Sequence, residues 1–450
     1  MKKYYNIKEI FINKKKLINK NIIIKGWVKY FRNNLFLEIN DGTTIKNIQV
    51  VLKKKNKNID IGITLKIYGK LREYNKKIEI ISLYIKKYGK IDKEYFNNSI
   101  LQNKFHNLYK LRQQSYLRFR TKLFSSIMRI RHLLSIKIHK YLNKKNFYYI
   151  NTPIITNNDT EGIGEIFNVT ILNIKKKYNN YKDDFFGCKA NLTVSGQLEA
   201  ESAILGLNKV YTFGPVFRAE NSNTNKHLSE FWMVELEMMF YKFKNIIKFS
   251  EKFIKYLIKV ILKYNIEELK YLEKYNKIKI IKLLKNIYIK KFIKISYNLV
   301  IKKINKIKKN LILWGSDIST KYEKILFKKI FKKNIPLIIY NYPKKIKPFY
   351  MKSNKDNITV KSFDIIFPNV GEIIGGSERE ISYIKILNNF KKKNKNKNIN
   401  NIKWYLNLRK LGKIYHSGFG LGFERLIQFI TGMKNIRDVI PFPRYPGNIN

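Results

Sequence analysis

The chain is 450 residues long, more than one ordinary hydrophobic core accommodates, so two or more domains are expected. Its single cysteine, Cys188, excludes a disulfide framework and a cysteine-rich zinc site, and it fits a reducing cytoplasm. No apolar run approaches the roughly 18 residues that span a bilayer, and the charged N-terminus lacks the apolar core of a secretory signal. These properties predict a soluble cytoplasmic protein without a membrane segment.

The net charge of +60 has two explanations. Lysine and arginine release the counterions of phosphates, so the charge permits binding to a polyanion such as RNA. However, only 13 of the 92 basic residues are arginine, and Ile, Asn and Tyr are abundant as well. Because these residues share adenine- and thymine-rich codons with lysine, a biased genome would produce the same excess. Charge alone therefore does not establish a nucleic-acid partner.

Five short β-strands are expected in the first 90 residues. They are the apolar or alternating runs at 22–28, 35–39, 48–52, 61–68 and 78–83. The turn Asn40-Asp41-Gly42 separates the second run from the third. Five short strands in so few residues are typical of a small closed barrel, foremost an OB-fold. We therefore expect an OB-fold domain over 1–95 and a connector over 96–120.

An amphipathic helix is expected from Thr121 to about Asn146, because apolar residues recur there at spacings of three and four. Residues 147–155 then predict a strand, in which Pro153 belongs at an edge because it cannot donate to a sheet ladder. Residues 242–310 are dominated by Lys, Ile and Asn and predict poorly defined peripheral helices without recognisable chemistry. Residues 391–401 form a basic low-complexity loop.

The strongest functional signal is the segment from Gly214 to Glu237. One strand ends in Arg218-Ala219-Glu220, and a second strand returns from a polar loop through Phe231. This hairpin would place Arg218 and Phe231 on one sheet surface. The planar guanidinium of arginine suits a phosphate or a carboxylate, which it binds with two parallel bonds. Taken alone, the segment is equally consistent with a surface ion pair on a hairpin.

A second signal is the glycine-spaced strand His416–Gly422, which leads into an apolar helix. Glycines allow a ligand to approach the backbone closely. Arg425 at the start of the helix would then point toward that ligand. Alone, the segment is weak evidence, because tight packing of a helix on a strand also requires glycine.

Together these two segments resemble motifs 2 and 3 of the class II aminoacyl-tRNA synthetases, and the helix before Pro153 resembles motif 1. Residues 192–201, 230–235 and 437–444 closely resemble the asparaginyl-tRNA synthetases of the aspartyl, asparaginyl and lysyl subgroup. The resemblance covers almost the whole chain except 242–310.

The resemblance implies an α+β protein in which an N-terminal OB-fold barrel reads the anticodon. It implies a catalytic domain over 121–450, with an antiparallel sheet flanked by helices. Motifs 1, 2 and 3 of that domain span about 121–155, 211–240 and 416–431. It further implies a homodimer built across motif 1. The implied reaction is ATP-dependent activation of L-asparagine to asparaginyl-adenylate, followed by transfer of the asparaginyl group to tRNA(Asn).

The resemblance also implies roles for individual residues. Arg218 would contact the α-phosphate of ATP and the substrate carboxylate, Phe231 would stack on the adenine, and Arg425 would bind the γ-phosphate. The ATP-binding residues implied in this way are Arg218, Glu220, His227, Phe231, Glu372 and Arg425, and those with a catalytic role are Arg218, Glu220 and Arg425. Asp364 and Glu372 resemble magnesium carboxylates, and hard oxygen ligands are what Mg²⁺ prefers. An ion pair at the strand ends is their alternative role.

Selection of asparagine over aspartate is implied at two positions. The aspartyl enzymes carry a lysine where this chain has Ala200, and an aspartate where it has Glu235. Glu235 would accept from the substrate amide, Arg379 would donate to the amide oxygen, and repulsion of a second carboxylate would exclude aspartate. The residues implied to hold asparagine are Glu161, Ser195, Gln197, Glu235 and Arg379.

The implied anticodon-binding residues are Arg32, Phe36 and Gln49 on the barrel. Phe36 can stack on an anticodon base, and Gln49 can bond a base edge.

Three other functions stay open at this point: an aspartyl-tRNA synthetase, a catalytically degenerate RNA-binding relative, and an asparagine-synthesising relative. The chain also departs from the family pattern at Lys226 and Lys324, where arginine is usual. These departures put the strength of acceptor-stem contacts in doubt.

Overall fold

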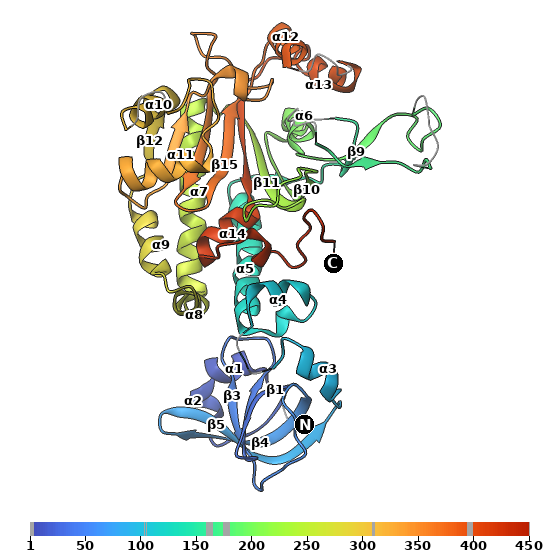
Figure 1. Ribbon diagram of the computed structural model, residues 1–450, viewed down its shortest axis with the longest axis vertical. Coiled ribbons are helices and arrows are strands. Elements are labelled where there is room, and N and C mark those ends of the chain that lie inside the picture. The colour runs from blue at the N-terminus through green and yellow to red at the C-terminus, as the bar shows by residue number, and fades with distance from the viewer. Residues whose placement is uncertain are drawn as a thin grey trace. The chain divides into compact units, whose positions relative to one another are not determined.

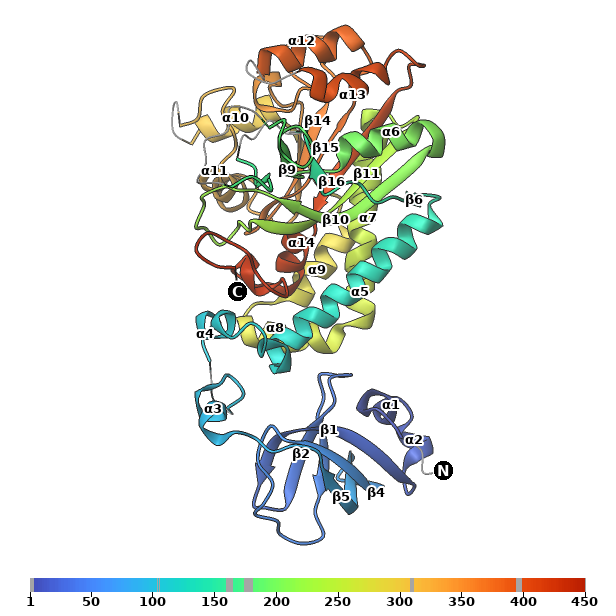
Figure 2. The same ribbon diagram turned by 90° about the vertical axis from the view of Figure 1, so that its right-hand side faces the viewer.

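The computed structural model describes residues 4–102, 104, 106–158, 165–173, 181–307, 311–393 and 399–449 (Figures 1 and 2). The chain divides into two compact units, Met1–Arg129 and Ile130–Asn450. Glu161, expected at the substrate site, lies outside the described residues. No helix in the described ranges is long and apolar enough to cross a membrane.

The first unit contains a closed five-stranded barrel in the order β1-β2-β3-β5-β4. Its strands are β1 (Asn21–Arg32), β2 (Phe36–Asn40), β3 (Ile48–Val51), β4 (Thr64–Tyr74) and β5 (Lys77–Lys87). All neighbouring pairs are antiparallel except β3 and β5. Each expected strand is confirmed, because apolar residues alternate along it and one side chain in two points into the barrel.

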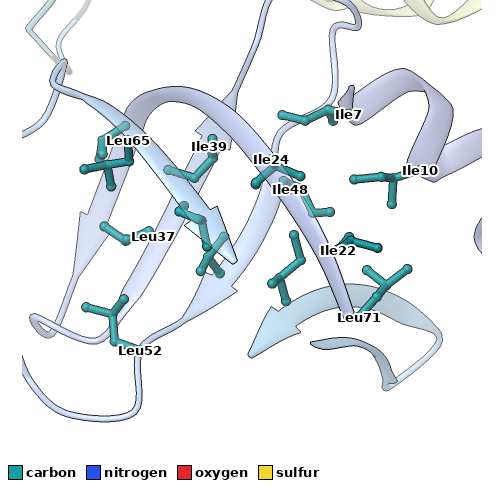
Figure 3. Packing of buried hydrophobic residues seen from close by; sticks show 14 of the residues in the cluster. Ile7, Ile10, Ile22, Ile24, Leu37, Ile39, Ile48, Leu52, Leu65 and Leu71 are labelled. Carbon is teal, nitrogen blue, oxygen red and sulfur yellow. The ribbon is translucent and has the colours of Figure 1, made fainter. Parts of the chain in front are cut away.

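The barrel core consists of aliphatic side chains from all five strands and from α1 (Ile7–Ile12) (Figure 3). Along β1, Ile22, Ile24 and Val28 are almost fully buried. A capping box starts α1: the Asn6 side chain accepts from the Glu9 amide, and the Glu9 side chain accepts from the Asn6 amide. The helix places Ile7 and Ile10 against the core, where both are fully buried. The other helical elements that lie wholly in this unit are α2 (Lys14–Leu17), α3 (Lys93–Asn98), α4 (Leu108–Gln113) and η1 (Arg118–Arg120).

The second unit is built on an eight-stranded sheet. Its strands, in spatial order, are β12 (Ile293–Ser296), β13 (Leu337–Tyr340), β14 (Ser362–Phe367), β15 (Gly371–Glu378), β16 (His416–Gly422), β11 (Glu230–Met239), β10 (Lys209–Phe217) and β6 (Tyr148–Tyr149). The six inner strands pair antiparallel, as the resemblance implied, whereas β12 and β6 add to the two edges in parallel. A separate small sheet joins β7 (Ile155–Thr156), β9 (Ala190–Leu192) and β8 (Asn168–Val169).

Helices flank the large sheet. They include α5 (Lys122–Lys144), which confirms the expected amphipathic helix, and α6 (Gln197–Leu207), which packs on β10 and β11. The others are α7 (Phe243–Tyr264), α8 (Ile266–Asn276), α9 (Ile280–Ile289), α10 (Tyr297–Asn305), α11 (Thr320–Ile325), α12 (Tyr383–Lys393), α13 (Lys403–Asn407) and α14 (Phe423–Thr431). Short helical turns complete the unit at η2 (Leu326–Ile330), η3 (Lys344–Ile346), η4 (Ile399–Ile402) and η5 (Ile436–Asp438).

The described part of 242–310 is mostly helical as expected, but it is not peripheral. Its first helix, α7, buries nine side chains and packs against β15 and β16, and Figure 2 shows α9 beside it. The Tyr141 ring of α5 also packs on the Phe253 and Tyr256 rings of α7. Isoleucine and phenylalanine at helical spacing therefore keep a buried face, although lysine fills the other positions.

Barrel closure depends on Gly69, which sits at an irregularity in the pairing of β4 with β5. A Cβ at this position would lie 2.3 Å from the Ile81 carbonyl oxygen and 2.6 Å from the Ile80 side chain. Since backbone cannot move aside, Gly69→Ala should lower the free energy of unfolding of the barrel by about 1–3 kcal/mol. Urea denaturation, with the fluorescence of the barrel as the signal, measures this free energy. The matched control is Gly89→Ala, because nothing lies within 4 Å of a Cβ there. Equal stability of the two variants would contradict the tight closure.

Candidate active site

A cavity of about 640 Å³ opens in the second unit over the strands β11, β15 and β16. Ten of the residues singled out by sequence line it: Ser195, Gln197, Arg218, Glu220, His227, Phe231, Glu235, Asp364, Glu372 and Arg425. They come from segments up to 230 residues apart in the sequence. The sheet therefore brings the two arginines, the carboxylates and the aromatic ring into one space.

Arg218 and Phe231 lie together at the end of the β10–β11 hairpin. Val216 pairs with Phe231, and the Arg218 amide donates to the Ser229 carbonyl at 2.9 Å. The Arg218 guanidinium carbon is 5.4 Å from the centre of the Phe231 ring. The predicted common surface is confirmed, and it presents a cation beside an aromatic face.

The loop between the two strands is held by local hydrogen bonds. The Nδ1 atom of His227 lies 2.8 Å from the Ser222 hydroxyl and 2.7 Å from the Thr224 hydroxyl. Burial lowers the pKa of His227; the Glu220 carboxylate opposes this, and the nearby Arg425 and Arg218 reinforce it. The imidazole is therefore neutral at neutral pH.

Lys226 stands where an arginine was expected, and it ties this loop to α11. Its ammonium lies 3.1 Å from the Glu323 carboxylate and 3.2 Å from the Thr320 hydroxyl. A lysine is sufficient here because the contact is a point-charge pair with one carboxylate oxygen.

Arg425 begins helix α14 and donates to the Glu372 carbonyl at 2.8 Å. Its neighbour Glu424 also lines the cavity and accepts from the Trp232 amide at 2.8 Å. A partner that sequence reasoning missed is Arg131, whose guanidinium is 2.7 Å from Glu424. The two residues are nearly 300 positions apart, so no local spacing could have joined them.

Asp364 and Glu372 lie on the adjacent strands β14 and β15 and converge above Gly375. A Cβ at Gly375 would be 2.8 Å from one Glu372 oxygen and 3.6 Å from one Asp364 oxygen. Burial raises the pKa of Asp364 to about 6; the Lys347 ammonium pulls that pKa down and the Glu372 carboxylate pushes it up. Such a raised pKa is expected for a buried carboxyl group with a second carboxylate beside it.

This pair fits magnesium. Mg²⁺ is usually held by one or two carboxylates together with water and substrate phosphates, rather than by a full cage of protein ligands. In keeping with that, the described residues contain no group of three or more His, Cys, Asp or Glu side chains that could hold a metal. The bare backbone of Gly375 leaves the space in which the two carboxylates meet.

Glu235 is anchored in the cavity by the start of α6. The Ser195 hydroxyl donates to one carboxylate oxygen, and the Gly196 amide donates to the other at 2.8 Å. Gln197 also lines the cavity and donates to Glu201 at 3.0 Å. Ala200 is fully buried and packs in an apolar cluster with Ile204, Val210 and Met239, so this position brings no cation to the cavity.

Arg379, which is expected at the substrate, bonds other side chains of the protein and is not among the residues that line the cavity. Its Nε and Nη2 atoms donate to the Glu237 carboxylate, and its Nη1 atom donates to the Ser377 hydroxyl at 2.6 Å. Its guanidinium instead packs on the Tyr350 ring, which does line the cavity. The reason is electrostatic, since the almost fully buried Glu237 and Glu201 both require a cation.

The pKa values of Glu237 and Glu201 are shifted in opposite directions. Burial raises the pKa of Glu237 to about 7 despite the Arg379 guanidinium, and the Glu201 carboxylate adds to the rise. Burial also opposes ionisation of Glu201, but Arg409, His416 and Arg379 hold the pKa of Glu201 well below its usual value. The network beside the cavity is thus stabilised by the arginines and His416.

The expected anticodon residues lie in the first unit, on the outward face of the barrel. Arg32 pairs with Phe36 across β1 and β2, and Glu38 pairs with Gln49 across β2 and β3. The Gln49 amide donates to Glu79 at 2.7 Å, and Arg72 bonds the other Glu79 oxygen at 2.7 Å. Sequence reasoning missed Arg72 and Glu79. In the sequence, a charged residue inside an apolar strand, Glu79, could have indicated this polar contact.

Comparison with protein-family models assigns residues 107–446 to "tRNA synthetases class II (D, K and N)" and residues 22–88 to "OB-fold nucleic acid binding domain". The asparagine–tRNA ligases of Borrelia garinii subsp. bavariensis and Borreliella burgdorferi are each 44% identical to this chain, over 99% of both chains. Among solved structures, asparaginyl-tRNA synthetase from Pyrococcus horikoshii complexed with asparaginyl-adenylate superposes with a TM-score of 0.87 at 29% identity, covering all of both chains.

A substitution at Gly375 tests whether the carboxylate pair above it binds a metal ion. The Gly375→Ala methyl group would collide with the end of the Glu372 side chain, which can swing away without unfolding the sheet. The displaced carboxylate should weaken binding of Mn²⁺ by about 10–100-fold, the usual effect of disturbing a metal ligand. Titration with Mn²⁺ followed by electron paramagnetic resonance measures this. Gly206→Ala is the control, since a Cβ there meets nothing within 4 Å. Unchanged Mn²⁺ affinity in Gly375→Ala would show that Glu372 does not bind the metal.

Proposed function

We infer that this protein ligates asparagine to tRNA: the chain belongs to the class II tRNA synthetases of the D, K and N group, and its full length aligns with asparagine–tRNA ligases. It activates L-asparagine with ATP and transfers the asparaginyl group to tRNA(Asn). One observation carries the chemistry. A single cavity holds two arginines, a carboxylate pair and the anchored Glu235, which suit the triphosphate, a magnesium ion and the amino acid respectively.

The first step joins two anions. The asparagine carboxylate attacks the α-phosphate, a new P–O bond forms, and the bond to the departing pyrophosphate breaks. Because no protein nucleophile is required, catalysis consists of positioning and charge neutralisation. Arg218 bonds the α-phosphate and the attacking carboxylate, Phe231 stacks on the adenine, and Arg425 bonds the γ-phosphate.

The second step moves the asparaginyl group. The terminal ribose hydroxyl of tRNA attacks the acyl carbon, the ester bond forms, and AMP leaves with the electrons of the broken mixed anhydride. Glu220 and the neutral His227 lie on the loop of the β10–β11 hairpin and face ATP and the acceptor end. When bound to Asp364 and Glu372, Mg²⁺ supplies positive charge to the phosphates.

Selection of asparagine rests on Glu235. Its carboxylate is fixed by Ser195 and Gly196, and it accepts from the amide NH₂ of the substrate. Aspartate would bring a second carboxylate to the same place without a compensating lysine, because that position is the buried Ala200. Because Arg379 is bonded to Glu237, it is not proposed as a direct partner of the amide oxygen of the substrate. Arg379 instead acts through the Tyr350 ring on which it packs.

The alternatives are weaker. An aspartyl enzyme would require a cation beside Glu235, and a degenerate RNA-binding relative would not keep Arg218, Glu372 and Arg425 in one cavity. An asparagine-synthesising relative would have no use for an OB-fold.

We further propose that the protein works as a cytoplasmic homodimer. Exposed apolar side chains lie on the edge strand β6, at Tyr148 and Tyr149, and in the segment that leads into β7, at Ile154 and Ile155. This apolar edge fits the contact of a second copy, and β6 has no further strand on its outer side within the described sheet.

The test of the function is exchange of labelled pyrophosphate into ATP. Exchange should require asparagine, and aspartate should not replace it. In Glu235→Gln the side chain loses its charge and gains a donor. Asparagine binding should then weaken by about 1–3 kcal/mol, as for other buried hydrogen bonds, and the preference over aspartate should narrow.

Glu251→Gln on α7 is the matched control for Glu235→Gln, because its side chain pairs with Lys255 away from the cavity. Equal exchange with aspartate in the wild type would overturn the assignment of substrate. An unchanged preference in Glu235→Gln would move selectivity away from that residue.

The proposed anticodon surface has its own test. Phe36→Ala should raise the KM for tRNA in aminoacylation, because a base loses its stacking partner, worth about 1–3 kcal/mol. Pyrophosphate exchange needs no tRNA and should not change. Phe11→Ala on α1 is the control, since Phe11 is a partly buried phenylalanine that packs on the barrel core. If both variants raise this KM equally, the effect is loss of barrel stability and not loss of stacking.

A further inference from the structure

A lysine already lies where a metal ion would meet its carboxylate. Lys347 follows η3, in the connection between β13 and β14. Its ammonium is 2.8 Å from one oxygen of Asp364 and 2.6 Å from the other. It also lies 4.1 Å from the centre of the Tyr342 ring, which is almost fully buried. The contact is therefore a two-oxygen ion pair inside the cavity.

The charges around Lys347 are unequal. Three carboxylates lie close enough to act on the charge of Lys347: Asp364, Glu372 and Asp317, all of which line the same cavity. The Lys347 side chain is 15% exposed and that of Asp364 is 7% exposed, so solvent screens the pair poorly. Without the lysine, Asp364 and Glu372 would repel each other across the space above Gly375.

Lysine and a divalent ion cannot use Asp364 in the same way. The ammonium bonds both carboxylate oxygens, so a divalent ion bound to either oxygen would lie beside the ammonium and repel it. Metal binding must therefore loosen or displace Lys347. The ammonium sits on a flexible four-carbon stem, and the adjoining Ile346 and Pro348 also line the cavity, so a displaced ammonium stays beside the triphosphate.

We propose that Lys347 is an internal counter-cation of the metal site. It neutralises Asp364 before the metal binds and turns to the phosphates of the nucleotide when the metal takes the carboxylates. The inference rests on the proposed function, in which Asp364 and Glu372 hold magnesium. Its consequence is that metal alone binds weakly, so metal and ATP bind together.

The experiment measures Mn²⁺ binding to the full-length protein without nucleotide, by electron paramagnetic resonance, in four variants. Lys347→Met removes the charge and keeps the length of the side chain. It should bind Mn²⁺ about 10–100-fold more tightly, because an opposite charge beside a carboxylate changes its affinity for a cation by about one to three powers of ten. Lys347→Arg keeps the charge and should bind Mn²⁺ as the wild type does. Asp364→Asn should lose this binding.

The control is Lys352→Met. Lys352 lies 2.7 Å from the Glu378 carboxylate, which Lys361 also contacts, and neither Lys352 nor Glu378 lines the cavity. This variant removes a comparable lysine–carboxylate pair and should leave Mn²⁺ affinity unchanged. Thermal unfolding of every variant separates altered binding from loss of fold.

A second measurement follows the displaced ammonium. In pyrophosphate exchange, Lys347→Met should raise the KM for ATP by about tenfold, the effect of one lost charge-assisted bond to a phosphate. Lys347→Arg should recover most of this loss, and the KM for asparagine should not move.

The outcomes are distinct. If Asp364→Asn loses Mn²⁺ while Lys347→Met binds it no more tightly than the wild type, the metal site stands and the role of Lys347 is overturned. If Asp364→Asn and the wild type bind Mn²⁺ equally, the proposed metal site fails and this inference fails with it. Tighter binding in Lys347→Met together with a raised KM for ATP supports the proposal.

Discussion

The cavity depends on one strand, β11, that is paired on both sides in a fixed register. Phe231 faces Val216 of β10, and Glu235 faces Gly420 of β16. Because side chains alternate along a strand, Phe231, Met233 and Glu235 all reach the cavity. A slip of one residue would turn all three to the opposite face. The residues proposed to stack on adenine and to recognise the substrate amide are thus positioned by the same backbone hydrogen bonds.

Further along the same face of this strand, buried charges hold neighbouring elements together. Glu201 of α6 accepts from Arg409 and from the Tyr405 hydroxyl, and Glu237 of β11 pairs with Arg379, which follows β15. Removing one partner of such a buried pair typically destabilises a protein by roughly 3–5 kcal/mol, because the other charge is left without compensation. The same helix, α6, begins at Gly196, whose amide fixes Glu235. The network therefore supports the helix whose start positions Glu235, the residue proposed to select asparagine.

Local pattern predicted the parts of this molecule that local physics determines. Alternation along β1 and β2 gave the barrel strands, and three- and four-residue spacing gave α5. The hairpin with Arg218 and Phe231 followed from two strands around a short polar loop. These features depend on residues close in sequence, so their signal survives the excess of lysine.

Features set by distant partners were not predictable in this way. Arg379 was expected at the substrate, but Glu237, 142 positions away, holds it in a buried ion pair. The pairing of Arg131 with Glu424 and of Lys347 with Asp364 has no counterpart in sequence spacing. The abundance of lysine predicts that helix α7 is peripheral, yet its apolar stripe packs against the sheet. Charge matching across a folded core is a property of the tertiary structure.

The few arginines of the chain make contacts that depend on the shape of the guanidinium group. Only 13 of 92 basic residues are arginine, and several of them do what an ammonium cannot. Arg379 grips both oxygens of one carboxylate, Arg409 bonds Glu201 and Tyr405 with one guanidinium, and the Arg437 guanidinium stacks 3.7 Å from the Tyr445 ring centre. A planar fork can bond in two directions or lie flat on a ring, and a point charge cannot. In a chain whose cations are mostly lysine, these arginines occupy positions at which the shape of the cation matters as well as its charge.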